Sequence, residues 1–144
     1  KPEATAEVLV DGWLRSGDVG RLDAEGFVYV EDRIKDMVLR GGENVYCAEV
    51  EAAIHEHPAV HEVAVFGVPH DRLGEEVAAV VVPRAGSSVT ETELVAFLAE
   101  RLAPFKVPTR LRIRPEPLPR NAAGKFLKRD LRREEEAASA SATA

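Results

Sequence analysis

Several classes of protein are excluded by what this sequence has little of. It has one cysteine, Cys47, among 144 residues, so it can form neither a disulfide framework nor a cysteine zinc site. No apolar run approaches the roughly 18 residues of a membrane span, and no signal-peptide pattern is found near Lys1. We therefore expect a cytoplasmic protein. Because the chain begins in mid-pattern at Lys1, we also expect it to be a piece of a longer polypeptide.

Catalytic and metal-binding patterns are scarce as well. The four histidines are scattered, and His55 and His57 would lie about 200° apart on a helix, which does not suit a shared metal. The sequence has no Gly-x-Ser-x-Gly and no phosphate-cradling glycine-rich loop followed by Lys-Ser/Thr. The pair Gly41-Gly42 is more typical of a hairpin turn than of a phosphate site. The residues alone leave one candidate, the glycine-flanked Lys125 in a basic segment.

The composition, 45% hydrophobic and 31% charged, is that of an ordinary soluble domain, and the length suffices for a hydrophobic core. The net charge of -6 hides a segregation. Residues 1–100 carry 8 basic and 20 acidic side chains, whereas residues 101–133 carry 11 basic and 2 acidic ones. A basic last third indicates either an anionic ligand or a solvated basic helix, and composition leaves both open.

Periodicity and turn residues predict an α+β fold, a small sandwich of sheet and helices. The expected elements are hairpins at 20–32 and 35–47, a helix over 48–57, central strands at 60–68 and 76–83, a helix capped by Thr90 and Glu93 and reaching Leu102, a half-exposed strand at 110–116, and a last helix through Phe126, Leu127 and Leu131. Residues 1–34 predict a strand-rich arm that cannot build a core alone. The small, polar residues 134–144 predict a disordered tail.

Two stretches carry a resemblance to a known superfamily. They are "DGWLRSGDVGRLDAEGFVYVEDRIKDMVLRGGENVYCAEVE" (Asp11–Glu51) and "LPRNAAGKFLKRDLR" (Leu118–Arg132). Together they resemble the C-terminal part of adenylate-forming enzymes, which include acyl-CoA synthetases, luciferases and the adenylation domains of peptide synthetases. The similarity extends over about residues 1–133. The run "RGGENVYCAEVE" looks most like fatty-acyl-CoA ligases, since the peptide-synthetase branch reads closer to "RGxRIELGEIE".

The resemblance implies a domain division and a reaction. Residues 1–34 would be the end of a large N-terminal AMP-binding domain, and residues 35–133 the mobile C-terminal domain. The full-length enzyme would join a carboxylic acid to ATP as acyl-AMP and then transfer the acyl group to the CoA thiol. ATP and CoA are thus implied co-substrates, with Mg2+ bound outside this chain. Because the phosphate loop and acyl pocket belong to the large domain, we expect the chain alone to be inactive.

Nucleotide-binding and hinge roles are also implied by the resemblance. Asp18 matches the aspartate that binds the ribose hydroxyls, and a carboxylate suits two hydroxyl donors. Arg33 matches the arginine of the ribose-phosphate region. Lys35 matches the hinge residue at which the small domain rotates between the two half-reactions.

Two loops would serve the two half-reactions. Gly41, Gly42 and Glu43 match the hairpin loop that lines the pantetheine tunnel, where glycine lets the backbone approach closely. Lys125 matches the lysine that contacts the α-phosphate and the carboxylate during adenylation. Negative charge grows on the α-phosphate during attack, so an ammonium there favours the transition state.

Three positions depart from the family pattern. Cys47 stands where many relatives have proline, Ala123 replaces a common Thr or Ser, and Asn44 stands where other branches place an arginine near the phosphates. The contact that this arginine makes is therefore in doubt here.

Two other readings remain beside an acyl-CoA ligase. The chain could be the lid of an adenylation domain that loads a carrier protein. The acceptor distinguishes this reading from the first: a carrier-protein thiol would support the lid, and the thiol of free CoA would support the acyl-CoA ligase. It could also bind nucleic acid through its basic segment, but only Phe105 and Phe126 lie there to stack on bases, so we expect no nucleic-acid partner. The remaining expected partner is the protein's own large domain, and an arm with unpaired strand edges also allows a homodimer.

Overall fold

A computed structural model describes residues 1–142 of the chain. It divides into two compact units, Lys1–Lys35 and Asp36–Ala144. The observed division falls one residue after the boundary expected from the sequence.

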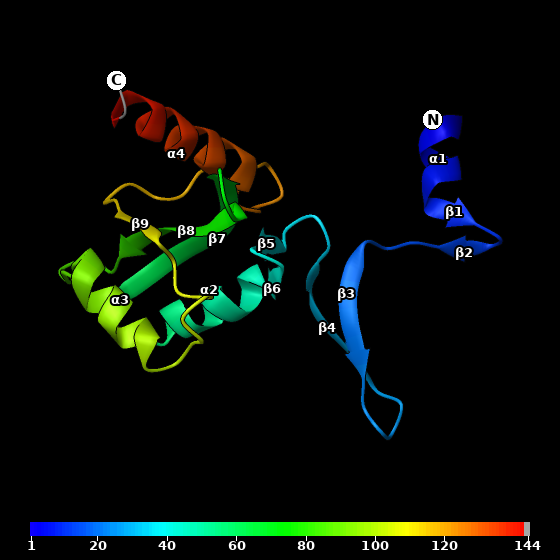
Figure 1. Cartoon of the computed structure of the whole chain (residues 1–144), viewed down its shortest axis with the longest axis horizontal. Helices are drawn as coiled ribbons and strands as arrows, with labels where there is room; N and C mark the ends of the chain where they lie inside the picture. The colour runs from blue at the N-terminus through cyan, green and yellow to red at the C-terminus, as the bar shows by residue number, and fades with distance from the viewer. Residues whose placement is uncertain (143–144) are drawn as a thin grey trace. The chain divides into compact units, whose positions relative to one another are not determined.

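The first unit consists of a short helix and two hairpins (Figure 1). The elements are α1 (Pro2–Val8), β1 (Leu9–Val10), β2 (Trp13–Leu14), β3 (Asp18–Leu22) and β4 (Val28–Arg33), with β1 paired to β2 and β3 paired to β4, both antiparallel. The β3–β4 hairpin and its turn were predicted, and Gly26 has the positive φ of 90° that such a turn needs. Helix α1 was not predicted; none of its residues is buried.

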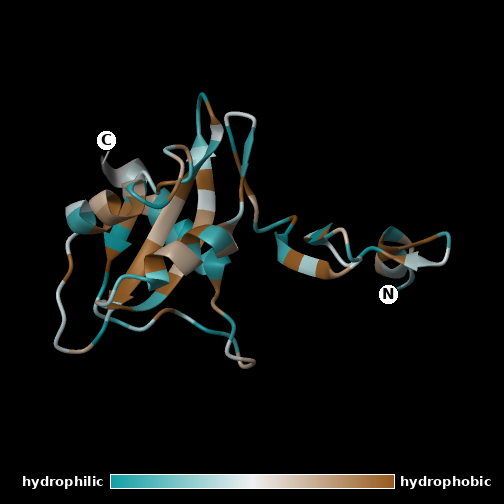
Figure 2. Ribbon diagram, turned by 90° about the horizontal axis from the view of Figure 1, so that it is seen from below, coloured by the Kyte–Doolittle hydropathy of each residue, from teal (hydrophilic) through white to brown (hydrophobic). Residues whose placement is uncertain are grey.

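Large hydrophobic side chains are exposed along this first unit. In Figure 2 its β3–β4 hairpin includes brown, hydrophobic stretches. The exposed side chains are Val8, Leu9, Trp13, Leu14, Leu22, Phe27, Val28, Tyr29, Val30 and Ile34. The most exposed is Trp13, at 80%. A two-stranded hairpin buries too little apolar surface to form a core by itself, as predicted for this segment.

The second unit contains a mixed sheet built on two long strands. Its strands are β5 (Val38–Arg40), β6 (Glu43–Val45), β7 (Val60–His70), β8 (Gly74–Pro83) and β9 (Arg110–Ile113). β8 is central: it pairs antiparallel with β7 along its length, parallel with β9, and with β5 at Arg40 and Gly74. The predicted central place is therefore confirmed for β8, but it is wrong for β7, which pairs with β8 alone among the described strands and lies at the edge of the sheet.

Helices cover both faces of this sheet (Figure 1). α2 (Cys47–His55) and α3 (Glu91–Ala99) pack on one face, and α4 (Lys128–Ala142) packs on the other. Because side chains alternate along a strand, β8 contributes Val77 and Val81 to the first face and Val80 to the second.

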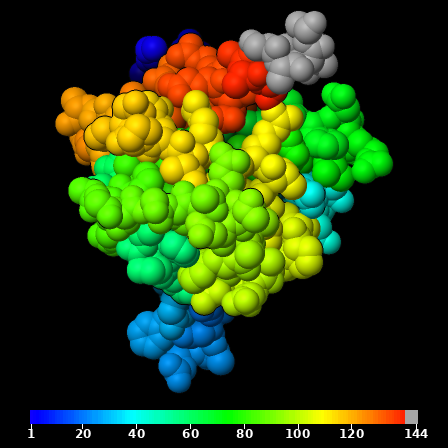
Figure 3. All heavy atoms as spheres, turned by 90° about the vertical axis from the view of Figure 1, so that its left-hand side faces the viewer, coloured from blue at the N-terminus to red at the C-terminus, as the bar shows by residue number. Residues whose placement is uncertain are grey.

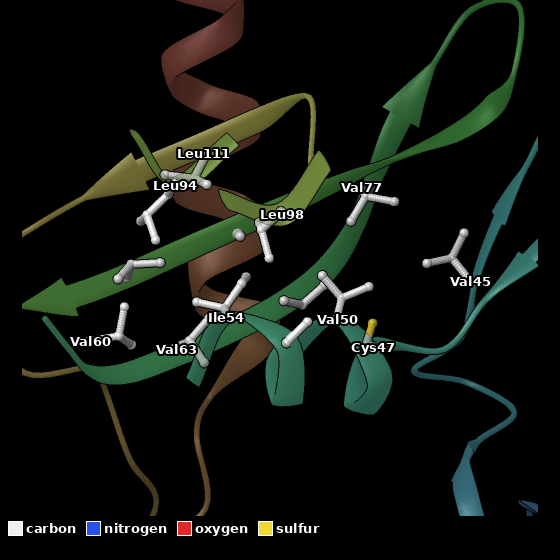
Figure 4. Packing of buried hydrophobic residues seen from close by; sticks show 14 of the residues in the cluster. Val45, Cys47, Val50, Ile54, Val60, Val63, Val77, Leu94, Leu98 and Leu111 are labelled. Carbon is white, nitrogen blue, oxygen red and sulfur yellow. The ribbon is translucent and has the colours of Figure 1, made fainter. Parts of the chain in front are cut away.

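The larger core lies between the sheet and α2 and α3. Figure 4 shows Val50 and Ile54 of α2 and Leu98 of α3 directed at the strand residues Val63 and Val77. All five side chains are at most 1% exposed. The predicted apolar faces of both helices are thus confirmed, and so is the capping box of Thr90 and Glu93 at the start of α3. The predicted end of this helix at Leu102 is wrong, since α3 ends at Ala99.

The last helix differs from the prediction at both ends. It begins at Lys128, because Phe126 forms an antiparallel bridge with Arg120 instead. It continues to Ala142, so the disordered tail expected over 134–144 is wrong for 134–142; residues 143–144 lie outside the described part. Alanine and glutamate have high helix propensity, and Arg132 pairs with Glu136 one turn on. None of the helices within residues 1–142 is long and apolar enough to cross a membrane.

Candidate functional site

Lys125 lies at the end of a tight loop that closes on itself. The N–H of Asn121 donates to the carbonyl of Lys125 at 2.9 Å, and the N–H of Gly124 donates to the carbonyl of Asn121 at 2.9 Å. The side-chain oxygen of Asn121 accepts the N–H of Ala123 at 3.0 Å and of Lys125 at 2.9 Å. Gly124 has φ 81°, a conformation that glycine adopts without strain. The backbone of Lys125 is therefore held in place.

This loop is anchored to strand β7 through Arg120. The guanidinium of Arg120 donates to the carbonyl of Gly124 at 2.8 Å and to the carboxylate of Glu62 at 2.7 Å. The same guanidinium lies 4.1 Å from the centre of the Phe126 ring. Glu62 also accepts the N–H of Leu118 at 2.8 Å. Burial of Glu62 acts to raise its pKa, but the contacts from Leu118 and Arg120 outweigh it and hold the pKa below its ordinary value.

The loop borders an open hollow of about 510 Å³ on the surface. The residues around it are Asp36, Arg120, Gly124, Lys125, Phe126, Leu127, Lys128 and Arg129. Figure 3 shows the yellow-to-orange segment between β9 and α4 at the surface beside α4. Lys125 is exposed, and its ammonium forms no ion pair with any residue between 1 and 142. A cation is thus presented to solvent on a backbone that is fixed.

A second lysine beside the hollow is engaged in structure. The ammonium of Lys128 lies 2.9 Å from the carboxylate of Glu51 on α2. Burial acts to lower the pKa of Lys128, but the charge of Glu51 outweighs it and the pKa lies above its ordinary value of 10.5. Lys128 therefore stays charged and holds α4 to α2, while Lys125 remains available to a ligand.

Asp18 and Arg33, the two predicted ribose-binding residues, are brought together in the first unit. They are register partners at the open end of the β3–β4 hairpin. The Nε of Arg33 donates to the carboxylate of Asp18 at 3.1 Å. The side chains are 31% and 51% exposed, respectively, so both can still be reached by a polar ligand.

The glycine turn forms where the sequence predicts a hairpin, and Lys35 lies shortly before it in the chain. Lys35 lies in an exposed turn and is the last residue of the first unit. Gly41 and Gly42 form the turn between β5 and β6 with φ 60° and 92°. The N–H of Gly41 donates to the carbonyl of Leu73 at 2.8 Å, which ties the hairpin tip to the loop between β7 and β8. No hydrogen bond or ion pair within residues 1–142 joins Lys125 to residues 41–43.

A metal centre is not built by the described residues. Between residues 1 and 142, no group of three His, Cys, Asp or Glu side chains could hold a metal ion.

Sequence reasoning missed three residues that support the Lys125 loop: Glu62, Arg120 and Asn121. Glu62 is far from the loop in sequence, and its pairing has no periodic pattern that could have been detected. Asn121 did carry a signal, because asparagine three residues before a Gly-Lys pair is typical of a turn closed by its side chain.

The comparisons with known proteins agree with one another. The family profile described as AMP-binding enzyme C-terminal domain matches residues 49–125, which is more than half of the chain. A long-chain-fatty-acid–CoA ligase of Bacillus subtilis (strain 168) is 51% identical over 135 residues, which is 94% of this chain and 24% of the relative. A fatty acid–[acyl-carrier-protein] ligase of Streptomyces coeruleorubidus is 47% identical over 131 residues, which is 91% of this chain and 25% of the relative.

Solved structures show the same similarity. The o-succinylbenzoate CoA synthetase of Bacillus subtilis, in complex with its acyl-adenylate intermediate, is 40% identical and matches with a TM-score of 0.84. The match covers 91% of this chain and 26% of that structure. The chain therefore spans about a quarter of the length of the relatives it matches.

Proposed function

Since the chain belongs to the family of AMP-binding enzyme C-terminal domains, we propose that it is the C-terminal part of an AMP-forming acyl-CoA ligase. The full-length protein would activate a carboxylic acid, in this proposal a fatty acid, as acyl-AMP with release of pyrophosphate. It would then transfer the acyl group to the thiol of CoA. The relative from Bacillus subtilis, a long-chain-fatty-acid–CoA ligase, supports this choice of substrate.

The observation that carries the proposal is the ammonium of Lys125, which forms no ion pair with the described residues, on a loop whose backbone is held by hydrogen bonds. A charge that forms in a transition state is best stabilised by a group already in position, because no reorganisation is then needed during the reaction. The hydrogen bond that the N–H of Lys125 donates to Asn121, and the one that Arg120 donates to the carbonyl of Gly124, hold the backbone around Lys125 in this way. We assign Lys125 to the α-phosphate and the carboxylate oxygens in the adenylation step.

The remaining residues receive roles from the family pattern and their local geometry. We assign Asp18 and Arg33, which are paired and still exposed, to the ribose of the nucleotide. Lys35, at the junction of the two units, would be the hinge for the rotation that switches half-reactions. Gly41, Gly42 and Glu43 would line the path of the pantetheine arm. A Cβ added at Gly42 would meet no atom within 4 Å, so a narrow ligand has room beside the backbone there, whereas Gly41 faces Leu73.

ATP–pyrophosphate exchange by the full-length protein tests the role of Lys125. We expect exchange with a fatty acid in a panel of carboxylates, and a loss of about 10²- to 10³-fold in Lys125→Ala, which is the cost of removing one preorganised charge-stabilising group. Conversion of pre-made acyl-AMP to the thioester should remain near the wild-type rate. Arg129→Ala is the matched control, because Arg129 is an exposed cation that borders the same hollow.

The two variants separate the outcomes. Undiminished exchange in Lys125→Ala would reduce Lys125 to a surface charge and contradict its assigned role. An equal loss in Arg129→Ala would mean that the general positive charge of the hollow matters, and not the position of Lys125. Exchange with none of the carboxylates would contradict the ligase assignment itself.

A carrier protein is the alternative acceptor of the acyl group. The relative from Streptomyces coeruleorubidus is a fatty acid–[acyl-carrier-protein] ligase, so free CoA is not the acceptor throughout this family. Acyl transfer from pre-made acyl-AMP to CoA and to a phosphopantetheinyl carrier protein, measured side by side, distinguishes the two. Transfer to the carrier protein alone would replace CoA in the proposal.

The large N-terminal domain is the proposed partner of the first unit. The chain spans about a quarter of the length of its relatives, and the large hydrophobic side chains of the first unit are exposed in this chain. We also propose that the chain alone is inactive, because a phosphate loop and an acyl pocket are not among its motifs. Detection of acyl-AMP made by the purified chain would overturn this part.

A further inference from the structure

Glu62 is a largely buried carboxylate for which the proposed function has no assigned use. It lies on β7, where the pairing register with β8 shifts between Val60 and Glu62. Its side chain is only 12% exposed. Its neighbours on the same face of the strand, Ala64 and Phe66, belong to the core beneath α4.

The carboxylate of Glu62 holds the segment before Lys125 at two points. One oxygen accepts the N–H of Leu118 at 2.8 Å, and the other accepts from the Arg120 guanidinium at 2.7 Å. Leu118 is itself 3% exposed in the core, so the start of the segment is fixed to the sheet. Its far end is fixed by Leu131 of α4, which is fully buried.

Arg120 passes this restraint on to the loop. A second nitrogen of its guanidinium donates to the carbonyl of Gly124, the residue directly before Lys125, at 2.8 Å. Because the guanidinium is planar and rigid, an arginine held by a carboxylate on one side presents its other donors in a fixed direction. The Phe126 ring lies 4.1 Å from the guanidinium and limits its motion further.

We propose that Glu62 is a positioning residue for adenylation, which sets the place of the Lys125 ammonium through Arg120 and the carbonyl of Gly124. This inference rests on the proposed function of Lys125 and extends it to strand β7. Glu62 would touch neither the nucleotide nor the acyl group. Its contribution is that the loop keeps one conformation when the ammonium meets the α-phosphate.

The test is Glu62→Gln in the full-length protein, which keeps the size of the side chain and removes its charge. Displacement of a catalytic group by about 1 Å can cost on the order of 10²-fold in rate, so we expect kcat for ATP–pyrophosphate exchange to fall by about 10-fold or more. The rate of thioester formation from pre-made acyl-AMP should stay within about 2-fold of the wild type, because Lys125 serves the other half-reaction.

Glu76→Gln is the matched control for a merely structural role. Glu76 on β8 is also a buried glutamate: its side chain is 10% exposed, accepts from Thr109 at 2.7 Å and pairs with Arg110. It has no hydrogen bond to the segment 118–125. Both variants should lower the melting temperature, but only Glu62→Gln should separate the two half-reactions.

Arg120→Lys tests the same connection from its exposed end, even if Glu62→Gln fails to fold. A lysine ammonium cannot hold Glu62 and the carbonyl of Gly124 in the fixed geometry of a guanidinium, so exchange should fall and thioester formation persist. In the double variant Glu62→Gln/Arg120→Lys, the loss of exchange activity should be no larger than in Arg120→Lys alone, because the effects of two residues that act through one contact are not additive.

The outcomes separate this inference from the function on which it rests. If Lys125→Ala loses exchange while Glu62→Gln and Arg120→Lys retain it, the positioning role is wrong and the function of Lys125 stands. If Glu62→Gln slows both half-reactions equally, and Glu76→Gln does the same, then Glu62 has only a structural role. If Lys125→Ala itself keeps full exchange, the assigned role of Lys125 fails, and the positioning role of Glu62 fails with it.

Discussion

The carboxylate of Glu51 on α2 lies 2.9 Å from the ammonium of Lys128 at the start of α4. α2 and α4 cover opposite faces of the sheet, and Glu51 also accepts the N–H of Val65 on β7 at 2.8 Å. One side chain thus connects all three layers of the second unit. The contact also lies three residues from Lys125, so the same layers that build the core determine where the loop emerges.

Removing this carboxylate should destabilise the protein. In Glu51→Ala the N–H of Val65 and the ammonium of Lys128 both lose their partner, and we expect a loss of about 2–3 kcal/mol in the free energy of unfolding. Glu51→Gln keeps an acceptor for Val65 and should lose about half as much. Urea unfolding of the second unit, followed by circular dichroism, measures both. Equal losses in the two variants would show that the ion pair with Lys128, and not the hydrogen bond to Val65, dominates.

Stability at acidic pH should depend on Glu76. Burial acts to raise its pKa, but the Thr109 hydroxyl and the Arg110 guanidinium outweigh it, so the pKa in the folded state lies below the ordinary 4.5. A carboxyl with a lowered pKa stabilises the fold above its unfolded value and loses this contribution as the pH falls through the folded value. Above pH 5, Glu76→Gln should therefore be less stable than the wild type by about 1–3 kcal/mol. The difference should shrink below pH 4.5, as unfolding curves taken across this range would reveal; a constant difference would contradict the pKa shift.

Gly67 should resist substitution for a reason found on the neighbouring strand. A Cβ added to Gly67 would lie 2.9 Å from the carboxylate atoms of Glu75, which accepts the N–H of Leu39 at 3.1 Å and lies 3.3 Å from Arg132. Gly67→Ala should push the carboxylate away from both partners and cost about 1–2 kcal/mol.

The reverse is expected once Glu75 is shortened. In a Glu75→Ala background the space is free, and Gly67→Ala should be neutral or stabilise by about 0.4–1 kcal/mol, because alanine has less freedom than glycine in the unfolded chain. Thermal unfolding of the four proteins of this cycle measures the coupling. A loss from Gly67→Ala that is the same in both backgrounds would mean that Glu75 is not its cause.

The parts of this fold that the sequence predicts are those coded locally. Local patterns predict the apolar strands β7 and β8, the buried face of α2 and the Thr90–Glu93 capping box. Each depends on residues that are close in the sequence, so hydrophobic periodicity and capping motifs identify them. Gly41 and Gly42 likewise predict a hairpin, because adjacent glycines are a local turn signal. Lys125 could be singled out as a candidate, but its role came from the resemblance and not from its spacing.

Other parts depend on contacts between distant residues and could not be predicted. Glu62 and Arg120 are 58 residues apart, and nothing in either local sequence states that they meet. The parallel pairing of β9 with β8 is equally non-local. The extent of α4 was misjudged because its polar composition was read as disorder, whereas Arg112 pairs with Glu134 and ties the helix to β9.

The exposed hydrophobic side chains of the first unit give the last prediction. If residues 8–34 belong against a large N-terminal domain, their backbone N–H groups should exchange with deuterium quickly in this chain and slowly in the full-length protein. The second unit supplies the internal control, because β7 and β8 are buried in its own core and should be protected equally in both. Hydrogen exchange followed by mass spectrometry resolves the two regions in one experiment. Equal rates for residues 8–34 in both proteins would mean that the large domain does not cover this surface, and the proposed partner of the first unit would be wrong.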